Sequence, residues 1–205
     1  GVVVINGSEA IETVKDKLYT QQILAQLNLD IPKTLLLKHP IDVEFVQKHI
    51  GFPVIIKTIS GSFGKGVFIA DNKKQLSQLI TMAEITNPRY DIIIQEFIKD
   101  SWGKDLRVFV VNNKVVGCMM RRATDEDFRA NLNRGGEGFP YEVNEQIEWM
   151  ASESSKSLGL DIAGVDLLFD GDGYKICEVN SSPGFEGMEK YTKKNIAEEV
   201  VSFVR

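Results

Sequence analysis

Residues 162–180 read IAGVDLLFDGDGYKICEVN, and this stretch decides the fold. Two largely apolar runs, 162–169 and 174–180, flank a segment of glycine and aspartate, a pattern that predicts a β-hairpin. We expect a three-residue turn at 171–173. Because hairpins join antiparallel strands, this stretch favours an α+β fold over a purely parallel sheet.

The expected hairpin places three oxygen-bearing side chains together. With a three-residue turn, Asp166 lies opposite Glu178, and their Cβ atoms are about 4.5–5.5 Å apart. Asn180 is two residues beyond Glu178, so it points to the same face. Two carboxylates this close are unfavourable without a cation between them, and this set of oxygens suits Mg²⁺ or Mn²⁺ better than zinc.

Two alternatives to this metal site stay open when only the residues are considered. The three side chains also fit a solvated polar edge with unrelated oxygens. A two-residue turn would instead set Asp166 opposite Cys177. Glu178, the expected partner of Asp166, would then point to the other face of the sheet.

Outward from the hairpin, helix and strand patterns interleave. Further strands are expected at 34–37, 52–57, 67–70, 91–98, 105–111 and 114–120, the last two joined by a turn at Asn112-Asn113. Helices are expected at 9–27 with Ser8 as the N-cap, and at 42–50, 73–84, 145–158 and 196–204. Residues 125–138 are polar and glycine-rich and are expected to form a loop. The organisation we expect is an N-terminal strand and helix (1–33), a first lobe (34–97) and a second lobe (98–205).

Composition excludes several classes of protein. The 205 residues carry 24 Lys+Arg and 29 Asp+Glu, a net charge of −5 that argues against electrostatically driven nucleic-acid binding. No apolar run is long enough for a membrane span. The two cysteines form neither a disulfide framework nor a metal pair, and a reducing, cytoplasmic location is the default.

Two further stretches offer groups that bind anions. Lys57 precedes the glycine-rich segment 60–66, whose backbone N–H groups can approach a phosphate closely, although neither a Walker A nor a GxGxxG motif is present. Arg121-Arg122 and the segment 127–136 together hold four arginines, which bind carboxylate or phosphate in bidentate fashion. Taken alone, each stretch is also explained as an ordinary surface loop.

Taken in order, the segments resemble the ATP-grasp superfamily and, within it, the RimK-type ligases that add glutamate to a carboxyl terminus. The resemblance extends from about residue 15 to 205. It rests on the segments DKL (16–18), VIIK (54–57), QEFI (95–98), DLR (105–107), RR (121–122), DFRAN (127–131), RGG (134–136), AGVD (163–166) and EVNSSPGFEG (178–187).

The resemblance implies two α+β lobes with ATP bound between them, and it assigns roles to individual residues. Residues that match the nucleotide-binding positions are Lys17, Lys57, Ser60, Gly61, Ser62, Gly64, Gly66, Glu96, Phe97, Asp105, Arg129, Ala130 and Asn131. Among these, the glycine-rich segment resembles a lid over the triphosphate, and Asp105 matches the ribose position. Asp166, Glu178 and Asn180 match the ligands of two Mg²⁺ or Mn²⁺ ions. Arg107, Arg121 and Arg122 lie where the family handles phosphate and acyl substrate.

The implied reaction is ATP-dependent amide formation through an acylphosphate, which asks the protein for positioning and charge stabilisation. The resemblance points to glutamate as the amino acid and to a protein or small molecule with a free carboxylate as the acceptor. It implies a cytoplasmic enzyme without nucleic-acid or membrane partners, and it is compatible with a homo-oligomer. A ligase of the same family with another amino acid or acceptor, and a non-catalytic ATP-binding module, are the alternatives. Family members usually carry a further domain before the strand preceding Asp16-Lys17, and we expect this chain to lack it.

Overall fold

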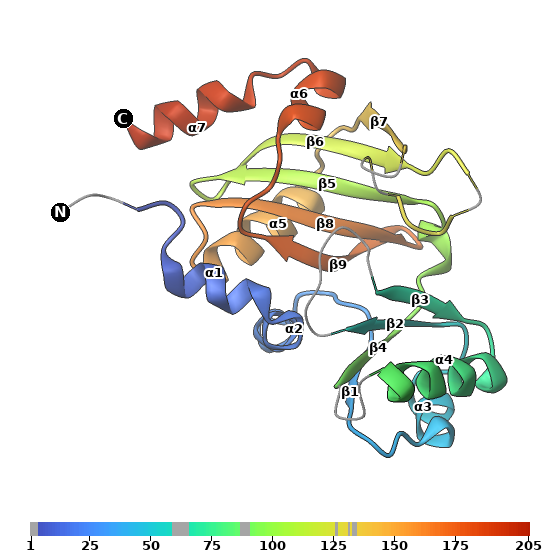
Figure 1. Ribbon diagram of the computed structural model, residues 1–205. Coiled ribbons are helices and arrows are strands. Elements are labelled where there is room, and N and C mark those ends of the chain that lie inside the picture. The colour runs from blue at the N-terminus through green and yellow to red at the C-terminus, as the bar shows by residue number, and fades with distance from the viewer. Residues whose placement is uncertain (1–3, 59–65, 87–90, 126, 131, 133–134) are drawn as a thin grey trace. The chain divides into compact units, whose positions relative to one another are not determined.

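The computed structural model describes residues 4–58, 66–86, 91–125, 127–130, 132 and 135–205. The chain divides into two compact units, a smaller one of residues 32–97 and a larger one of residues 1–31 and 98–205. Each unit contains an antiparallel sheet, of order β1-β4-β2-β3 in the smaller unit and β7-β6-β5-β8-β9 in the larger (Figure 1). Antiparallel sheets with packed helices confirm the expected α+β class.

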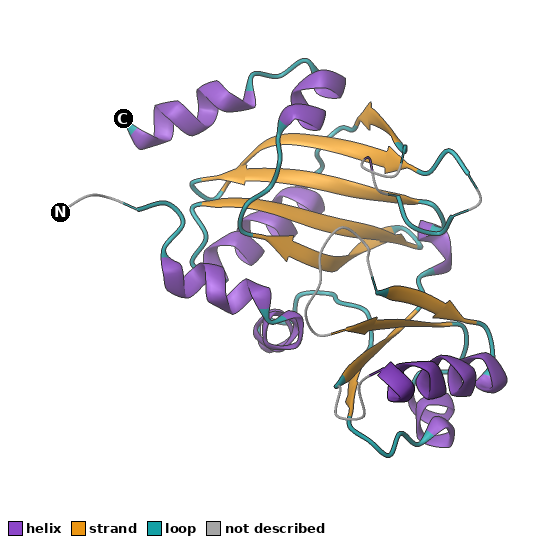
Figure 2. Cartoon of the chain, in the orientation of Figure 1, coloured by secondary structure: helices purple, strands orange, loops and turns teal. Residues whose placement is uncertain are grey.

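In the smaller unit, two helices pack against one face of a four-stranded sheet (Figure 2). The strands are β1 (Thr34–Leu37), β2 (Val54–Thr58), β3 (Val67–Ala70) and β4 (Ile92–Glu96), and the helices are α3 (Val43–His49) and α4 (Lys73–Thr86). Asp42 caps α3 by accepting hydrogen bonds from the N–H groups of Glu44 and Phe45. The core forms where alternate strand residues such as Val54 and Ile94 meet Leu76 of α4.

In the larger unit, helices cover both faces of a five-stranded sheet (Figure 2). The strands are β5 (Lys104–Val111), β6 (Lys114–Arg122), β7 (Glu137–Pro140), β8 (Ile162–Asp170) and β9 (Gly173–Asn180). Helices α1 (Ser8–Lys15), α2 (Lys17–Gln26) and α5 (Glu145–Ser157) pack on one face over aliphatic side chains such as Val108 and Leu167. Helices α6 (Glu186–Thr192) and α7 (Ile196–Val204) pack on the other face around Phe109 and Met119. A short 3₁₀ helix, η1 (Lys99–Ser101), precedes β5.

The N-terminal helix differs from the expectation of one helix over 9–27. Asp16 adopts extended dihedrals (φ −83°, ψ 99°), and its carboxylate accepts a hydrogen bond from the N–H of Tyr19 at 2.9 Å, which caps a second helix. The expected N-cap, Ser8, is wrong, because Gly7 holds that position and Ser8 is already helical. Residues 1–3 of the expected N-terminal strand lie outside the described residues, and Val4 and Ile5 form no strand.

Two short elements were absent from the sequence expectation. Helix α6 lies between the hairpin and the last expected helix, and β7 lies at the end of the expected loop over 125–138. Both depend on packing: Met188 of α6 is fully buried, and Gly138 of β7 leaves the space that the Tyr191 ring fills. An alanine Cβ at Gly138 would lie 2.5 Å from that ring.

The register of the β8–β9 hairpin is partly as expected. Asp170 pairs with Gly173, so the turn has two residues, and the expected three-residue turn is wrong. A β-bulge at Cys177 adds one residue to β9, and it returns Asp166 to the position opposite Glu178. The expected Asp166–Glu178 pairing is therefore confirmed.

Candidate functional site

One face of the larger sheet carries six of the predicted site residues. Cross-strand partners share a face, and the pairs here are Arg121 with Asp105, Arg107 with Asp166, and Asp166 with Glu178. Asn180 pairs with Gly164 on the same side. We call the surface formed by Asp105, Arg107, Arg121, Asp166, Glu178 and Asn180 the charged face.

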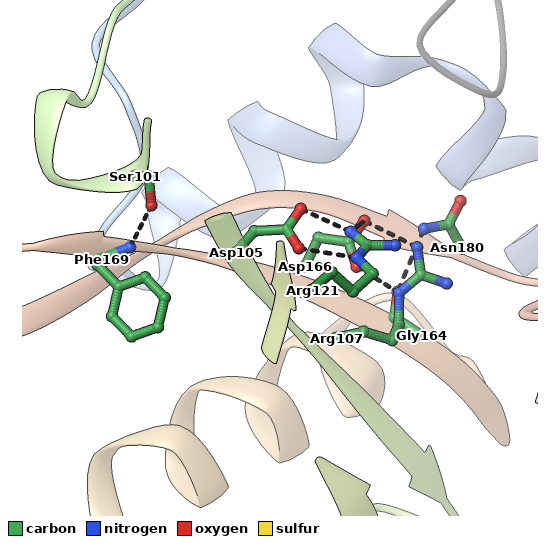
Figure 3. A network of polar contacts seen from close by, with 8 residues as sticks. All are labelled: Ser101, Asp105, Arg107, Arg121, Gly164, Asp166, Phe169 and Asn180. Carbon is green, nitrogen blue, oxygen red and sulfur yellow. Dashed lines mark hydrogen bonds and ion pairs between the residues drawn. The ribbon is translucent and has the colours of Figure 1, made fainter. Parts of the chain in front are cut away.

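Arg107 and Arg121 both bind the carboxylate of Asp166, which lies at the centre of the charged face (Figure 3). Arg107 donates from Nε to Asp166 Oδ1 and from Nη2 to Asp166 Oδ2, the latter at 2.8 Å. Arg121 reaches Asp166 Oδ2 with Nη2 at 3.0 Å, and it forms a bidentate pair with Asp105 at 2.7 and 2.6 Å. The four side chains form a ladder of alternating charge, and each is at most 16% exposed.

Burial and pairing act in opposite directions on the two carboxylates. Burial raises the pKa of Asp166, but the attraction of Arg107 and Arg121 outweighs burial, and the resulting pKa is lowered. For Asp105, burial outweighs the single pair with Arg121, and its pKa is raised. Burial lowers the pKa of Arg121, but Asp105 and Asp166 outweigh that effect and raise it. Perturbed, buried charges of this kind concentrate at functional sites.

The predicted metal ligands lie together, and their chemistry fits a hard divalent cation. Asn180 donates from Nδ2 to the carbonyl of Gly164 at 3.5 Å, which leaves its amide oxygen as an acceptor. Asp166 accepts from two arginines, and its Oδ1, which accepts from Arg107 alone, retains a further lone pair. Within the described ranges, no group of three or more His, Cys, Asp or Glu side chains forms a metal cluster, so this mixed carboxylate–amide set is the metal-site candidate.

Gly164 is a residue of this site that the sequence expectation missed. A Cβ at position 164 would lie 2.7 Å from Pro183 Cβ, 3.1 Å from Arg107 Nη1 and 3.4 Å from Arg107 Cδ. The absence of a side chain therefore gives Arg107 its path across β8 to Asp166, and it lets the chain after Asn180 pack against the sheet. A glycine inside an otherwise apolar strand was the available signal.

Asn6 is a second residue that the sequence expectation missed. It is 5% exposed, and its Nδ2 donates to the carbonyls of Ile162 and Ser181, both at 2.7 Å. Its Oδ1 accepts from the N–H groups of Asp161 and Ile162 at 2.7 and 2.9 Å. Asn6 thereby fixes the start of β8 against the residue that follows Asn180. The sequence gives no sign of this contact, because the partners are at least 155 residues away.

The remaining predicted residues of the larger unit occupy other positions. Arg122 is exposed and lies over the Phe139 ring at 5.4 Å, and strand alternation puts it on the opposite face from Arg121. Lys17 is the first residue of α2. Arg129 forms a bidentate pair with Asp127 at 2.8 and 2.7 Å, which raises its pKa. Ala130 is buried, and Asn131 lies outside the described residues.

The predicted nucleotide residues of the smaller unit lie on two of its strands and beside them. Lys57 is on β2, paired with Val67 and Ile93. Glu96 ends β4, and its carboxylate accepts a hydrogen bond from the N–H of Lys33 at 2.9 Å. The N–H of Phe97 donates to the carbonyl of Pro53 at 3.4 Å. In the expected lid, Ser60, Gly61, Ser62 and Gly64 lie outside the described residues, and Gly66 has a positive φ of 74°.

The helices of the described ranges include none with the length and hydrophobicity that a membrane crossing needs.

Comparison with known proteins shows which family the chain matches. A model of the RimK-like ATP-grasp domain matches residues 14–204. A protein of Coxiella burnetii (strain Dugway 5J108-111) named "Probable alpha-L-glutamate ligase" is 40% identical over 205 residues, which are 100% of this chain and 67% of that protein. A protein of the same name from Thioalkalivibrio sulfidiphilus (strain HL-EbGR7) is 37% identical over the same lengths.

Solved structures agree on the fold. The RimK domain ATP-grasp protein of Sphaerobacter thermophilus DSM 20745 aligns with a TM-score of 0.77 at 18% identity, over 99% of this chain and 72% of that one. The ATP-grasp ligase PsnB, solved with a phosphomimetic variant of a minimal precursor, Mg and ADP, aligns with a TM-score of 0.76 at 20% identity. The alignment covers all of this chain and 62% of the PsnB chain.

Proposed function

The chain belongs to the RimK-like ATP-grasp family, and on that premise we propose that it forms amide bonds at the expense of ATP, adding L-glutamate to a carboxylate. The observation that carries the proposal is the charged face, where three carboxylates and an amide lie beside Arg107 and Arg121. The name of the Coxiella relative supports glutamate as the amino acid, and the PsnB complex supports a peptide acceptor, ADP and Mg²⁺.

The proposed reaction has two steps. A carboxylate oxygen of the acceptor attacks the γ-phosphorus of ATP, the bond to the β-phosphate oxygen breaks, and ADP leaves. The amine of glutamate then attacks the acyl carbon of the acylphosphate, the C–O bond to phosphate breaks, and the nitrogen loses a proton to solvent. Both steps move negative charge between oxygens, so positioning and fixed positive charge supply most of the catalysis.

The residues of the chain divide this work between them. Asp166, Glu178 and Asn180 would hold Mg²⁺ or Mn²⁺, which when bound clamps phosphoryl oxygens and offsets their charge. We assign Arg107 and Arg121 to the charge that develops on the transferred phosphoryl group. The residues that we assign to the nucleotide are Lys17 and Lys57 for the phosphates, Glu96 and Phe97 for adenine, Asp105 for ribose, and Arg129, Ala130 and Asn131 in the adjoining segment. We leave Arg122 without a role, because it lies on the other face of the sheet.

The amino acid is tested directly. We expect a peptide that ends in glutamate to lengthen when it is incubated with ATP, Mg²⁺ and L-glutamate, and to stay unchanged with each of the other nineteen amino acids. Mass spectrometry of the product detects each addition. Extension with a different amino acid would refute the glutamate assignment. ADP release that does not depend on an acceptor would favour a hydrolytic or purely ATP-binding module.

The metal assignment is tested at Glu178, whose backbone pairing does not depend on its side chain. We expect Glu178→Ala to lower the rate of ADP release by at least about 100-fold, because phosphoryl charge loses its metal clamp. Asp172→Ala is the matched control, since it removes an exposed carboxylate from the turn of the same hairpin. Circular dichroism verifies that both variants are folded. Turnover that survives in Glu178→Ala would remove this residue from the site.

A further inference from the structure

The contacts of Arg107 and Arg121 differ in a way that separates their roles. Arg121 has a carboxylate of its own, because its fork binds Asp105 through two hydrogen bonds and reaches Asp166 through one nitrogen. Arg107 directs its fork at Asp166 alone, since Nε donates to Oδ1 and Nη2 donates to Oδ2. Removal of Asp166 from this network would leave Arg121 paired and Arg107 without its carboxylate.

Asp166 is also the residue that the ladder shares with the proposed metal ligands. Across the sheet it faces Arg107 of β5 on one side and Glu178 of β9 on the other. A divalent cation between Asp166 and Glu178 would therefore meet a carboxylate whose two oxygens already accept from a guanidinium. Two cations on one carboxylate repel each other strongly in a buried, poorly solvated setting.

The side chain of Arg107 keeps 15% of its surface exposed, and its guanidinium lies next to a glycine. Gly164 has no side chain beneath the guanidinium, whose Nη1 would lie 3.1 Å from a Cβ at that position. The Arg107 guanidinium lies beside Gly164 and Asn180 (Figure 3). Displacement of the Arg107 side chain costs no strand pairing, because the hydrogen bonds of β5 with β6 and β8 involve backbone atoms.

We propose that Arg107 is an exchangeable occupant of the cation site, which holds Asp166 when the divalent ion is absent and releases it when the ion binds. The inference rests on the proposed function, since it takes Asp166 and Glu178 as metal ligands. The released guanidinium is then available to an anion of the substrate, such as a phosphoryl oxygen. Cation and anion therefore bind with positive coupling, and each tightens the binding of the other by the same factor.

This proposal predicts that the cation binds more tightly when its competitor is weakened. Mn²⁺ binding without nucleotide is measured by the electron paramagnetic resonance signal of the free ion. We expect Arg107→Lys, which keeps the charge and loses the fork, to lower the Mn²⁺ dissociation constant about fivefold. We expect Arg107→Met to lower it further, within the range of about 5- to 150-fold that couplings between sites usually span. Arg122→Lys and Arg122→Met are matched controls on the opposite face, and we expect neither to change the constant.

A second measurement uses the unaltered protein and does not depend on the folding of a variant. In protein labelled with ¹⁵N-arginine, the Nε–H signal of Arg107 reports its hydrogen bond to Asp166. We expect Mg²⁺ to shift this signal and to speed its exchange with water. The Arg121 signal should stay protected by Asp105.

The outcomes separate the inference from the proposed function. Unaltered protein that binds no Mn²⁺ would overturn both, since no cation is then present to exchange. Mn²⁺ binding that is equal in the unaltered protein and in Arg107→Lys, or tighter only in Arg107→Met, would overturn the exchange and leave the metal site standing. An Arg107 Nε–H signal that Mg²⁺ leaves unchanged would also overturn it.

Discussion

Asp166 and Leu167 are neighbours on β8, yet their side chains enter opposite faces of the same sheet. Leu167 is fully buried among aliphatic side chains from α5 and the adjoining strands. Asp166 is 6% exposed and is buried among charges. The apolar face is stable whenever its volume is filled, whereas the charged face is stable only while each charge has its partner. A site that exchanges ions is therefore expected on the charged face, because one ion can replace another as the partner of a charged side chain.

The largest expected effect is the loss of the shared carboxylate. Asp166→Ala leaves Arg107 without a counter-charge, while Arg121 keeps its pair with Asp105, and we expect a loss of about 3–5 kcal/mol of unfolding free energy. Urea denaturation measures this loss. Asp170→Ala, on the same strand, removes an exposed carboxylate from its pair with the half-buried Lys175 and should cost less than about 1 kcal/mol. Equal losses in the two variants would contradict the view that the ladder needs every partner.

The neighbouring position tests the apolar face by the same measurement. Leu167→Ala should cost about 2–5 kcal/mol, because it removes buried methyl groups and leaves a cavity. The two faces differ in how their losses are repaired. Arg107→Met should recover part of the stability of Asp166→Ala, since it removes the unpaired charge, and it should recover none in Leu167→Ala. Recovery in both backgrounds, or in neither, would contradict the distinction.

A smaller effect is expected at Gly164, where the charged face depends on missing volume. Gly164→Ala places a Cβ 2.7 Å from Pro183 Cβ and 3.1 Å from Arg107 Nη1, so one of them must shift, at about 1–3 kcal/mol. Gly184→Ala is the matched control, because a Cβ there meets nothing within 4 Å and the backbone has no positive φ. Thermal unfolding of both variants measures the difference. A Gly164→Ala protein as stable as Gly184→Ala would show that the space between residue 164 and the Arg107 side chain is larger than in the structure.

The sequence predicted the hairpin and its carboxylate pair, but the pairing is as expected only because two departures from the expected register offset each other. The turn is one residue shorter than expected, which by itself would have set Asp166 opposite Cys177. The bulge at Cys177 restores the pairing, and Gln21 Nε2 of α2 donates to the carbonyl of Cys177 at 3.3 Å. That contact spans 156 residues, so no local pattern in 162–180 announces it. Where the turn residues themselves set the geometry, as at Asn112-Asn113 with φ of 49° and 59°, the prediction is confirmed.

The ladder was less predictable than the hairpin. Arg107 and Asp166 meet because β5 and β8 are adjacent in the sheet, and 59 residues separate them in the chain. The family resemblance implied that Arg107, Arg121 and Arg122 lie where phosphate and acyl substrate are handled. No local pattern indicated that Arg107 pairs with Asp166 and Arg121 with Asp105. For Arg122 a local signal existed, because consecutive strand residues point to opposite faces and Arg121 and Arg122 therefore diverge. The nucleotide assignments depend on family resemblance, and they remain predictions.

The smallest expected effect is that of pH on stability. The charged face is expected to lose stability at low pH and the apolar face at high pH. On the charged face, the lowered pKa of Asp166 means that its stabilisation is present at neutral pH and is lost as pH falls through the folded-state value. On the apolar face, burial raises the pKa of the Cys118 thiol from 9.0 to about 12. The contribution of the Cys118 thiol to the free energy of unfolding is therefore complete below pH 9. It is lost between pH 9 and 12, because the thiol ionises in the unfolded chain and stays protonated in the folded one. The stability difference between the unaltered protein and Cys118→Ala should shrink by about 1 kcal/mol between pH 8 and pH 10. Parallel curves for the unaltered protein and Cys118→Ala would show that this thiol ionises as readily in the folded chain as in the unfolded one.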